Sequence, residues 1–258
     1  MPVSFSSPPR NLFLLGSSGA DVVRNFFHEV NTSSSQDVYI PDEIRYDYGS
    51  DRYFLAGTAQ NNNSNNSNNK KFGWIERRDY DADLDSNPPS PSSSTEWSVK
   101  IEDTNGQNTA NIDTTLRAME SYGNELVVVG KTGNVPWIAK YNNNGGIVWS
   151  STSNTADVEY TGVCKGGTNY YACGSTAVSG DAVSFVEKFD SNGNPGWGKS
   201  ATMLGRDVVL EKITANSRDE IIAVGYLEDD TADKGYIVKI NANTGEILWD
   251  RSLERNIS

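Results

Sequence analysis

The chain has 258 residues, a formal net charge of −12 and a pI of about 4.6. Phosphate binding requires clustered lysine and arginine, so this charge argues against nucleic acid and against anionic membrane surfaces as partners. No apolar run of about 18 residues is present, so no transmembrane helix and no membrane insertion are expected. The first residues lack the basic and apolar regions of a secretory signal, and the length suits one closed all-β domain.

Each of five successive units begins with a predicted strand, followed by an apolar run that ends in glycine. The first strands are predicted at residues 3–7, 44–48, 116–120, 160–164 and 210–213. The apolar runs end at Gly16, Gly57, Gly130, Gly174 and Gly225. Continuous apolar runs of this length are typical of strands that are buried on both faces.

Each unit then continues with a β-branched and aromatic strand, a turn and, in four units, a tryptophan. The clearest copy has a strand at residues 236–240, a turn at Asn243-Thr244-Gly245 and then Trp249. The other third strands are predicted at residues 26–31, 74–79, 137–142 and 185–190. The last three of these strands are followed by Trp97, Trp149 and Trp197. The strand at residues 26–31 fits the pattern less closely, and Tyr39 follows it in place of a tryptophan.

Four-stranded units of about 40–50 residues are typical of β-propeller blades. We therefore expect an all-β fold, a five-bladed β-propeller of four-stranded antiparallel blades, as a single domain over residues 1–258. The blades are predicted at residues 1–41, 42–103, 104–155, 156–205 and 206–258. Two β-sandwiches, or a larger propeller cut short after residue 258, are the alternatives. Each tryptophan is predicted to dock against the neighbouring blade, because its ring spans the gap between blades.

The residues from Asn241 to Trp249 resemble the tryptophan-docking motif of PQQ-type propeller repeats. Thr244, Gly245 and Trp249 match that motif, and Asn241 stands in place of an aspartate. The resemblance implies propeller blades. It implies no quinone cofactor here, because quinoprotein enzymes of that family carry an adjacent cysteine pair that this chain lacks. We expect no cofactor, apart from the calcium ion that is considered below.

The only two cysteines, Cys164 and Cys173, are not adjacent. A two-residue turn at Thr168-Asn169 would place them directly opposite each other on paired strands. A strained disulfide and two buried free thiols are both compatible with this placement, and the thiols are favoured.

The second unit carries two low-complexity inserts, an Asn/Ser stretch at residues 61–69 and a Ser/Pro stretch at residues 86–95. Neither can bury much apolar surface, so both are predicted to be loops. Aspartates alternate over residues 79–85, but Leu84 and Ser90 stand where a calcium-binding EF-hand loop needs glycine and glutamate. A solvated acidic hairpin is the favoured interpretation.

Aspartates precede the repeat glycine by similar distances in four units, and they are Asp42, Asp113, Asp157 and Asp207. They are predicted to lead into the first strand of each blade, which lies nearest the propeller axis. The favoured interpretation is that each carboxylate caps a turn. The alternative is an axial acidic ring that holds a hard cation such as Ca²⁺.

No P-loop, zinc or dinucleotide motif is present. His28 is the only histidine, and a structural role is favoured over a catalytic one. Aspartate and glutamate are plentiful, so a glycosidase that uses two carboxylates remains open.

The chain combines regular blades, Asn/Ser-rich loops and an acidic surface, and it lacks a signal peptide. In these features it resembles the propeller domains of virion proteins from tailed bacteriophages, especially cyanophages. The resemblance implies a non-enzymatic structural or binding protein that is made in the cytoplasm and acts in the virion or outside the lysed cell. Its partners would be other virion proteins or a host-surface glycan. The alternatives are a lectin-like carbohydrate-binding propeller and a glycoside hydrolase with axial carboxylates.

Overall fold

The computed structural model describes residues 37–47, 52–61, 71–79, 95–101, 113–123, 125–153, 157–176, 183–201, 207–216, 220–228 and 233–253. These residues form four antiparallel sheets of four strands each. In the part of the chain that is described, no helix is long and apolar enough to cross a membrane.

The first sheet contains β1 (Asp37–Asp47), β2 (Arg52–Asn61), β3 (Lys71–Asp79) and β4 (Thr95–Ile101). The second contains β5 (Thr114–Tyr122), β6 (Glu125–Thr132), β7 (Val135–Asn142) and β8 (Ile147–Thr152). The third contains β9 (Val158–Gly166), β10 (Asn169–Thr176), β11 (Ser184–Phe189) and β12 (Pro195–Ala201). The fourth contains β13 (Asp207–Ala215), β14 (Glu220–Glu228), β15 (Lys234–Asn241) and β16 (Ile247–Leu253).

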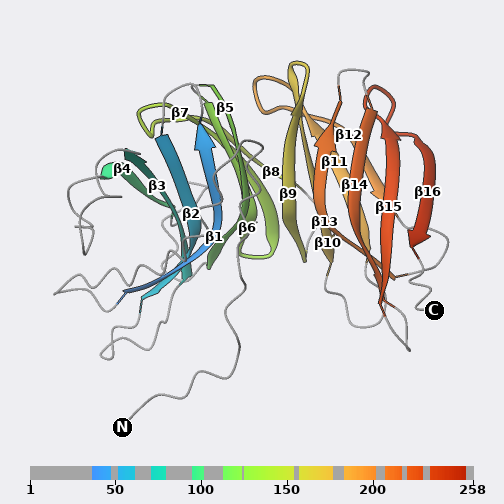
Figure 1. Ribbon diagram of the computed structural model, residues 1–258, viewed down its shortest axis with the longest axis horizontal. Coiled ribbons are helices and arrows are strands. Elements are labelled where there is room, and N and C mark those ends of the chain that lie inside the picture. The colour runs from blue at the N-terminus through green and yellow to red at the C-terminus, as the bar shows by residue number, and fades with distance from the viewer. Residues whose placement is uncertain are drawn as a thin grey trace, which may run out of the picture.

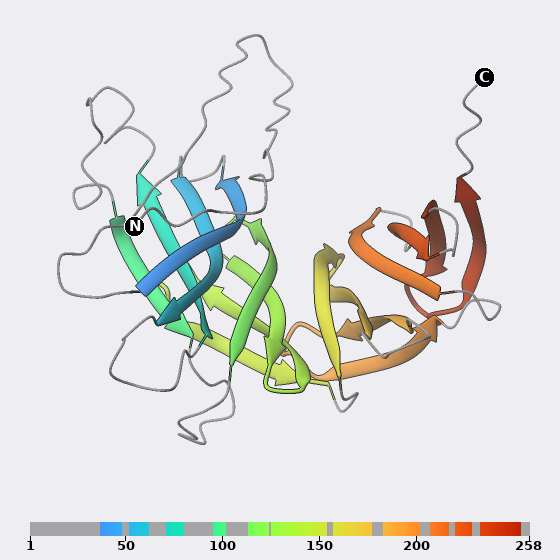
Figure 2. The same ribbon diagram turned by 90° about the horizontal axis from the view of Figure 1, so that it is seen from below.

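Within each sheet the strands follow one another in chain order. The four sheets also follow one another in chain order, side by side in Figure 1 and along an arc in Figure 2. The first strands are neighbours, since β5 contacts both β1 and β9, and β9 contacts β13. The prediction of an all-β fold built from repeated four-stranded antiparallel sheets is confirmed, whereas most of the fifth predicted blade, at residues 1–36, lies outside the described residues.

The first described strand begins earlier than predicted. Tyr39 was expected to close the first unit, but it lies in β1 and pairs with Ala59 of β2. The predicted boundary between residues 41 and 42 therefore falls inside a strand. Pro41 can lie within this strand because a β-bulge follows it, and bulges are among the places where a sheet accepts proline.

A β-bulge recurs at the same place in the first strand of every sheet. The bulged residues are Asp42, Arg117, Thr161 and Glu211. Opposite the bulge lies the repeat glycine, and a Cβ on Gly130, Gly174 or Gly225 would lie 1.9, 2.2 or 1.8 Å from a backbone oxygen of the first strand. The apolar runs end in glycine because the backbone of the bulged strand passes too close for any side chain.

The hydrophobic cores lie between consecutive sheets. Phe54 and Ile75 of the first sheet form one cluster with Leu116 and Met119 of the second. Equivalent clusters join the second sheet to the third and the third to the fourth. Each of the first three described sheets thus buries one face against the following sheet, which is how propeller blades and other repeats are stabilised.

The turn between β9 and β10 lies one residue earlier than predicted. Gly167 and Thr168 form the turn, with Gly167 at a φ of +59°, because a tight hairpin needs a residue that tolerates positive φ. As a result Cys164 lies opposite Tyr171 rather than opposite Cys173, and both cysteines are free and buried. Burial raises the pKa of the Cys173 thiol to about 12 and raises that of Cys164 as well, so neither thiol is reactive near neutral pH.

Candidate functional site

Three of the predicted docking tryptophans contact the next sheet through their indole nitrogens. The Nε1–O distances are 2.9 Å from Trp97 to Asn143, 3.1 Å from Trp149 to Ser191 and 3.0 Å from Trp197 to Ala242. All three acceptors are backbone oxygens in the turn between the third and fourth strands of the following sheet. Because all three rings are half-buried, these contacts combine a hydrogen bond with apolar packing.

The receiving turns are built around glycine. Gly145 and Gly193 have φ values of +76° and +82°. A Cβ on Gly145 would lie 2.9 Å from the ring of Trp97, and one on Gly193 would lie 2.5 Å from the ring of Trp149. Glycine is therefore required twice in these turns, by the backbone conformation and by the stacked ring.

Trp249 differs from the other three tryptophans. Its side chain is 38% exposed, and its indole nitrogen makes no hydrogen bond to a described residue. The guanidinium of Arg251, on the same strand, lies over the ring at 5.8 Å from its centroid. The docking role of Trp249 stays a prediction.

The four aspartates of the predicted acidic ring do not occupy equivalent positions. Asp113 and Asp157 lie three residues before the residue that pairs with the repeat glycine, and Asp207 has the same offset. Asp42 instead lies one residue after that position, within the bulge.

Asp113 and Asp157 are both exposed, and each directly precedes the first strand of its sheet. Asp113 accepts a hydrogen bond from the backbone nitrogen of Lys71, at 2.9 Å. Asp157 has a φ of +62°, and its backbone nitrogen donates to the oxygen of Asn134 at 2.7 Å. Nothing is described of the side chain of Asp207. Within the described ranges, no group of three or more His, Cys, Asp or Glu side chains could hold a metal ion, and the roles of the four aspartates stay predictions.

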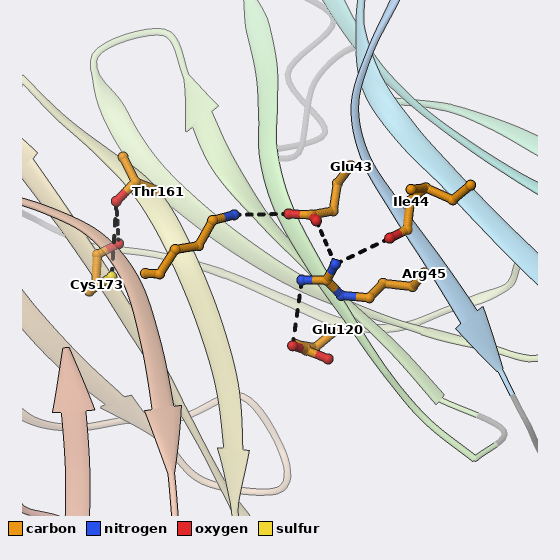
Figure 3. Close-up of polar contacts among 7 residues, drawn as sticks. Glu43, Ile44, Arg45, Glu120, Thr161 and Cys173 are labelled. Atoms are coloured by element: carbon orange, nitrogen blue, oxygen red, sulfur yellow. Dashed lines mark hydrogen bonds and ion pairs between the residues drawn. The ribbon is translucent and has the colours of Figure 1, made fainter. Parts of the chain in front are cut away.

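The structure instead gathers other charged residues where the first strands face one another (Figure 3). This inner charged cluster consists of Glu43 and Arg45 on β1, Glu120 on β5 and Lys212 on β13. The guanidinium of Arg45 lies 2.6 Å from Glu43 through Nη1 and 3.6 Å from Glu120 through Nη2. The Nζ atom of Lys212 lies 3.0 Å from the other oxygen of Glu43. Two carboxylates and two cations, contributed by three sheets, therefore meet in one place.

The two carboxylates of the cluster differ in their surroundings. The side chain of Glu43 is only 7% exposed, and both cations contact it. Glu120 is more open, at 32% exposure. Loss of hydration raises the pKa of Glu120 above its usual value, and the nearby charge of Glu43 adds to this effect, while Arg45 and Lys212 oppose it.

A second charged group surrounds the bulge of β1. Arg117 on β5 donates from Nε to Glu159 on β9 at 2.8 Å, and Thr115 donates to the same carboxylate oxygen at 2.5 Å. Burial raises the pKa of Asp42, while the positive charge of Arg117 and a hydrogen bond from Thr58 oppose the shift. Two first-strand carboxyl groups, Asp42 and Glu120, thus have raised pKa values.

This arrangement suits acid–base chemistry. A carboxyl group with a raised pKa keeps its proton to a higher pH than an ordinary carboxyl group does, and it can donate that proton in a reaction. A second carboxylate close to it can accept a proton from an attacking water molecule. Paired carboxyl groups with these two roles are the main requirement for hydrolysis of a glycosidic bond.

Sequence reasoning identified Asp42 but missed Glu43, Arg45, Glu120 and Lys212. The predicted strand at residues 44–48 excluded Glu43, and nothing in the chain marks the bulge that precedes it. The available signal was that all four lie beside or within the predicted first strands, where charged residues interrupt otherwise apolar segments.

The chain matches no protein family and no curated protein. Among solved structures it is similar to an α-L-arabinanase from Cellvibrio cellulosa, with 14% identity and a TM-score of 0.45 over 86% of this chain and 79% of that one. It is also similar to a prolyl endopeptidase (12% identity, TM-score 0.40, 87% of this chain and 29% of that one). A third similar structure is Drosophila semaphorin 2a (10% identity, TM-score 0.39, 84% of this chain and 58% of that one).

The arabinanase and the semaphorin are β-propeller proteins, as the repeated sheets predict. The expectation of a non-enzymatic virion protein is wrong on this comparison. The arabinanase is an enzyme, and none of these three structures is described as a phage protein. At this identity the likeness concerns the fold, so an activity has to be argued from the residues of this chain.

Proposed function

We propose that the protein is a glycoside hydrolase whose reaction takes place at the inner charged cluster. The observation that carries the proposal is the contact of Glu43 and Glu120, from neighbouring first strands, with the two ends of the Arg45 guanidinium. Carboxylates held in this way lie closer together than the roughly 9.5 Å that bounds the separation in glycosidases.

Glu120 is the general acid in this proposal. Its pKa is raised, so it keeps its proton to a higher pH than an ordinary glutamate, and its partial exposure lets a substrate approach. The proton passes to the glycosidic oxygen as its bond to the anomeric carbon breaks, so the leaving group departs as an alcohol. A water molecule forms the new bond to that carbon and gives a proton to Glu43, which acts as the general base.

The substrate class follows from the same groups. Arg45 and Lys212 are donors with side chains that are 32% and 56% exposed, and sugar hydroxyl groups accept hydrogen bonds from such cations. A glycan on a cell surface or in a polysaccharide would present these hydroxyls. The site of action outside the producing cell stays a prediction.

The experiment is an assay of reducing ends released from a panel of polysaccharides that includes arabinan, xylan, β-glucan and mannan. Glu120→Gln should lower the rate on any substrate that is cleaved by about 10²–10⁴-fold, because general acid catalysis contributes that much. Glu220→Gln is the matched control, since Glu220 is ion-paired with Lys239 at 2.7 Å on β14 and β15, outside the inner charged cluster.

Two outcomes would contradict the proposal. Equal effects of Glu120→Gln and Glu220→Gln would show that the inner charged cluster is only structural. Binding of a glycan by the unmodified protein without release of reducing ends would support the lectin-like alternative instead.

A further inference from the structure

The first strand of each described sheet carries one cationic residue. These residues are Arg45, Arg117, Lys165 and Lys212. The side chain of Lys212 is 56% exposed, whereas those of the other three are between 27% and 44% exposed. Lys212 is therefore the cation of the inner charged cluster that a bound molecule reaches most easily.

The two cations of the inner charged cluster differ in how firmly they are held. Arg45 donates through Nη1 to Glu43 at 2.6 Å and to the backbone oxygen of Ile44 at 3.1 Å (Figure 3). Its Nη2 atom lies 3.6 Å from Glu120. Lys212 contacts only Glu43 among the residues that the structure describes, at 3.0 Å. Because a lysine ammonium has three hydrogens, two of them remain for a ligand.

The carboxylate of Glu43 does not depend on Lys212 alone. Its side chain is 7% exposed, and Arg45 contacts Oε1 while Lys212 contacts Oε2. The four-carbon stem of a lysine is flexible, so the ammonium can turn toward a ligand while Arg45 keeps the carboxylate paired. Lys212 is thus available for binding, whereas Arg45 is committed to the protein.

The charges of the inner charged cluster favour an anionic ligand. Arg45 and Lys212 contribute two positive charges, and Glu43 contributes one negative charge. The general acid Glu120 is neutral before it gives up its proton, so the cluster then has one positive charge in excess. A neutral sugar leaves this charge without a counter-charge, whereas an anionic sugar supplies one.

We propose that Lys212 binds the anionic group of an acidic sugar, which is the carboxylate of a uronic acid or a sulfate ester. The inference rests on the proposed function, because it names the substrate class of the same site. Lys212 selects an acidic sugar over its neutral counterpart, while Glu120 and Glu43 carry out the reaction.

Binding is measured by calorimetry on the Glu120→Gln background, which prevents turnover through the general acid. The probes are oligogalacturonate and alginate oligosaccharides, each compared with its methyl ester, and carrageenan oligosaccharides, compared with their desulfated form. The two members of a pair differ in the anionic group alone. Lys212→Met removes the positive charge and Lys212→Arg keeps it. Lys239→Met is the matched control, since Lys239 is ion-paired with Glu220 at 2.7 Å outside the cluster.

At least one acidic probe should bind about fivefold more tightly than its neutral counterpart, which is what a partly exposed ion pair contributes. Lys212→Met should abolish this preference and change the affinity for the neutral counterpart by less than about twofold. Lys212→Arg and Lys239→Met should both retain the preference. A preference for the uronates identifies a carboxylate as the ligand, and a preference for the carrageenan oligosaccharides identifies a sulfate.

Equal binding of both members of every pair, no binding of any probe, or a preference that survives Lys212→Met would overturn the inference. The proposed function can fail separately. A preference that depends on Lys212, combined with no release of reducing ends by the unmodified protein, would support the inference and contradict hydrolysis. Hydrolysis of a neutral polysaccharide without any preference for acidic probes would do the reverse.

Discussion

Lys212, on the first strand of the last sheet, lies 3.0 Å from Glu43, on the first strand of the first described sheet. This ion pair joins two residues that are 169 positions apart in the sequence, and it links the two ends of the arc. The side chain of Lys212 is 56% exposed and that of Glu43 only 7%, so solvent screens the charge of the lysine but hardly reaches the carboxylate.

A double-mutant cycle with Lys212→Met and Glu43→Gln should give a coupling free energy of about 0.5–1 kcal/mol in urea denaturation. The coupling should decrease as salt is added, because solvent reaches the lysine. A coupling of zero at low salt would show that the two ends of the arc are not held together by this pair.

Loss of a docked tryptophan should destabilise the protein strongly. Trp197→Ala removes a hydrogen bond to Ala242 and apolar packing between the third and fourth sheets. We expect a loss of about 3 kcal/mol in the free energy of unfolding. Ile147→Ala, at a side chain that is 58% exposed, is the control and should stay within about 0.5 kcal/mol of the unmodified protein. Similar losses for the two variants would rule out docking as a major source of stability.

The receiving turns offer a matched pair of glycine substitutions. Gly193→Ala combines a φ of +82° with a Cβ only 2.5 Å from the ring of Trp149. Gly167→Ala has a similar φ of +59° but no neighbouring atom within 4 Å of the added Cβ. Both should lose about 1 kcal/mol through the backbone, and Gly193→Ala should lose more because Trp149 must move. Equal changes in thermal stability would show that the ring does not rest on the glycine.

The raised pKa of Glu120 predicts a pH dependence of stability. A carboxyl group whose pKa is higher in the folded state than in the unfolded state binds more protons when folded. Its contribution to stability is greatest below its unfolded pKa and is lost as pH rises from there through the folded value. The stability of Glu120→Gln relative to the unmodified protein should therefore rise with pH over that window, by at most about 1.4 kcal/mol per pH unit. A relative stability that is flat, or that falls, would mean that Glu120 is not desolvated.

The repeating framework could be predicted because glycine and tryptophan occupy positions that no other residue can fill. The repeat glycines lie against the backbone of a bulged strand, and the turn glycines lie under a tryptophan ring. Steric demands of this kind leave the same residue in each unit, so the sequence alone predicted four-stranded antiparallel sheets over the described residues.

The inner charged cluster could not be predicted in the same way. The bulged residues are an aspartate, an arginine, a threonine and a glutamate, so no shared residue type marks the bulge. A bulge shifts the alternation of side chains between the two faces of a sheet. A prediction that leaves the bulge out therefore places the side chains of Glu43 and Lys212 on the wrong face. The contact between these two also depends on how the sheets are arranged in space, which local sequence does not encode.

The choice of leaving group gives the most direct test of Glu120 as a general acid. An activated aryl glycoside needs no protonation of its leaving group, whereas a polysaccharide does. The test compares the best polysaccharide substrate with a dinitrophenyl glycoside of the same sugar. Glu120→Gln should lower the rate of hydrolysis of the polysaccharide by about 10²-fold or more and leave that of the dinitrophenyl glycoside nearly unchanged. Equal losses on both substrates, or no hydrolysis of either by the unmodified protein, would contradict the assignment.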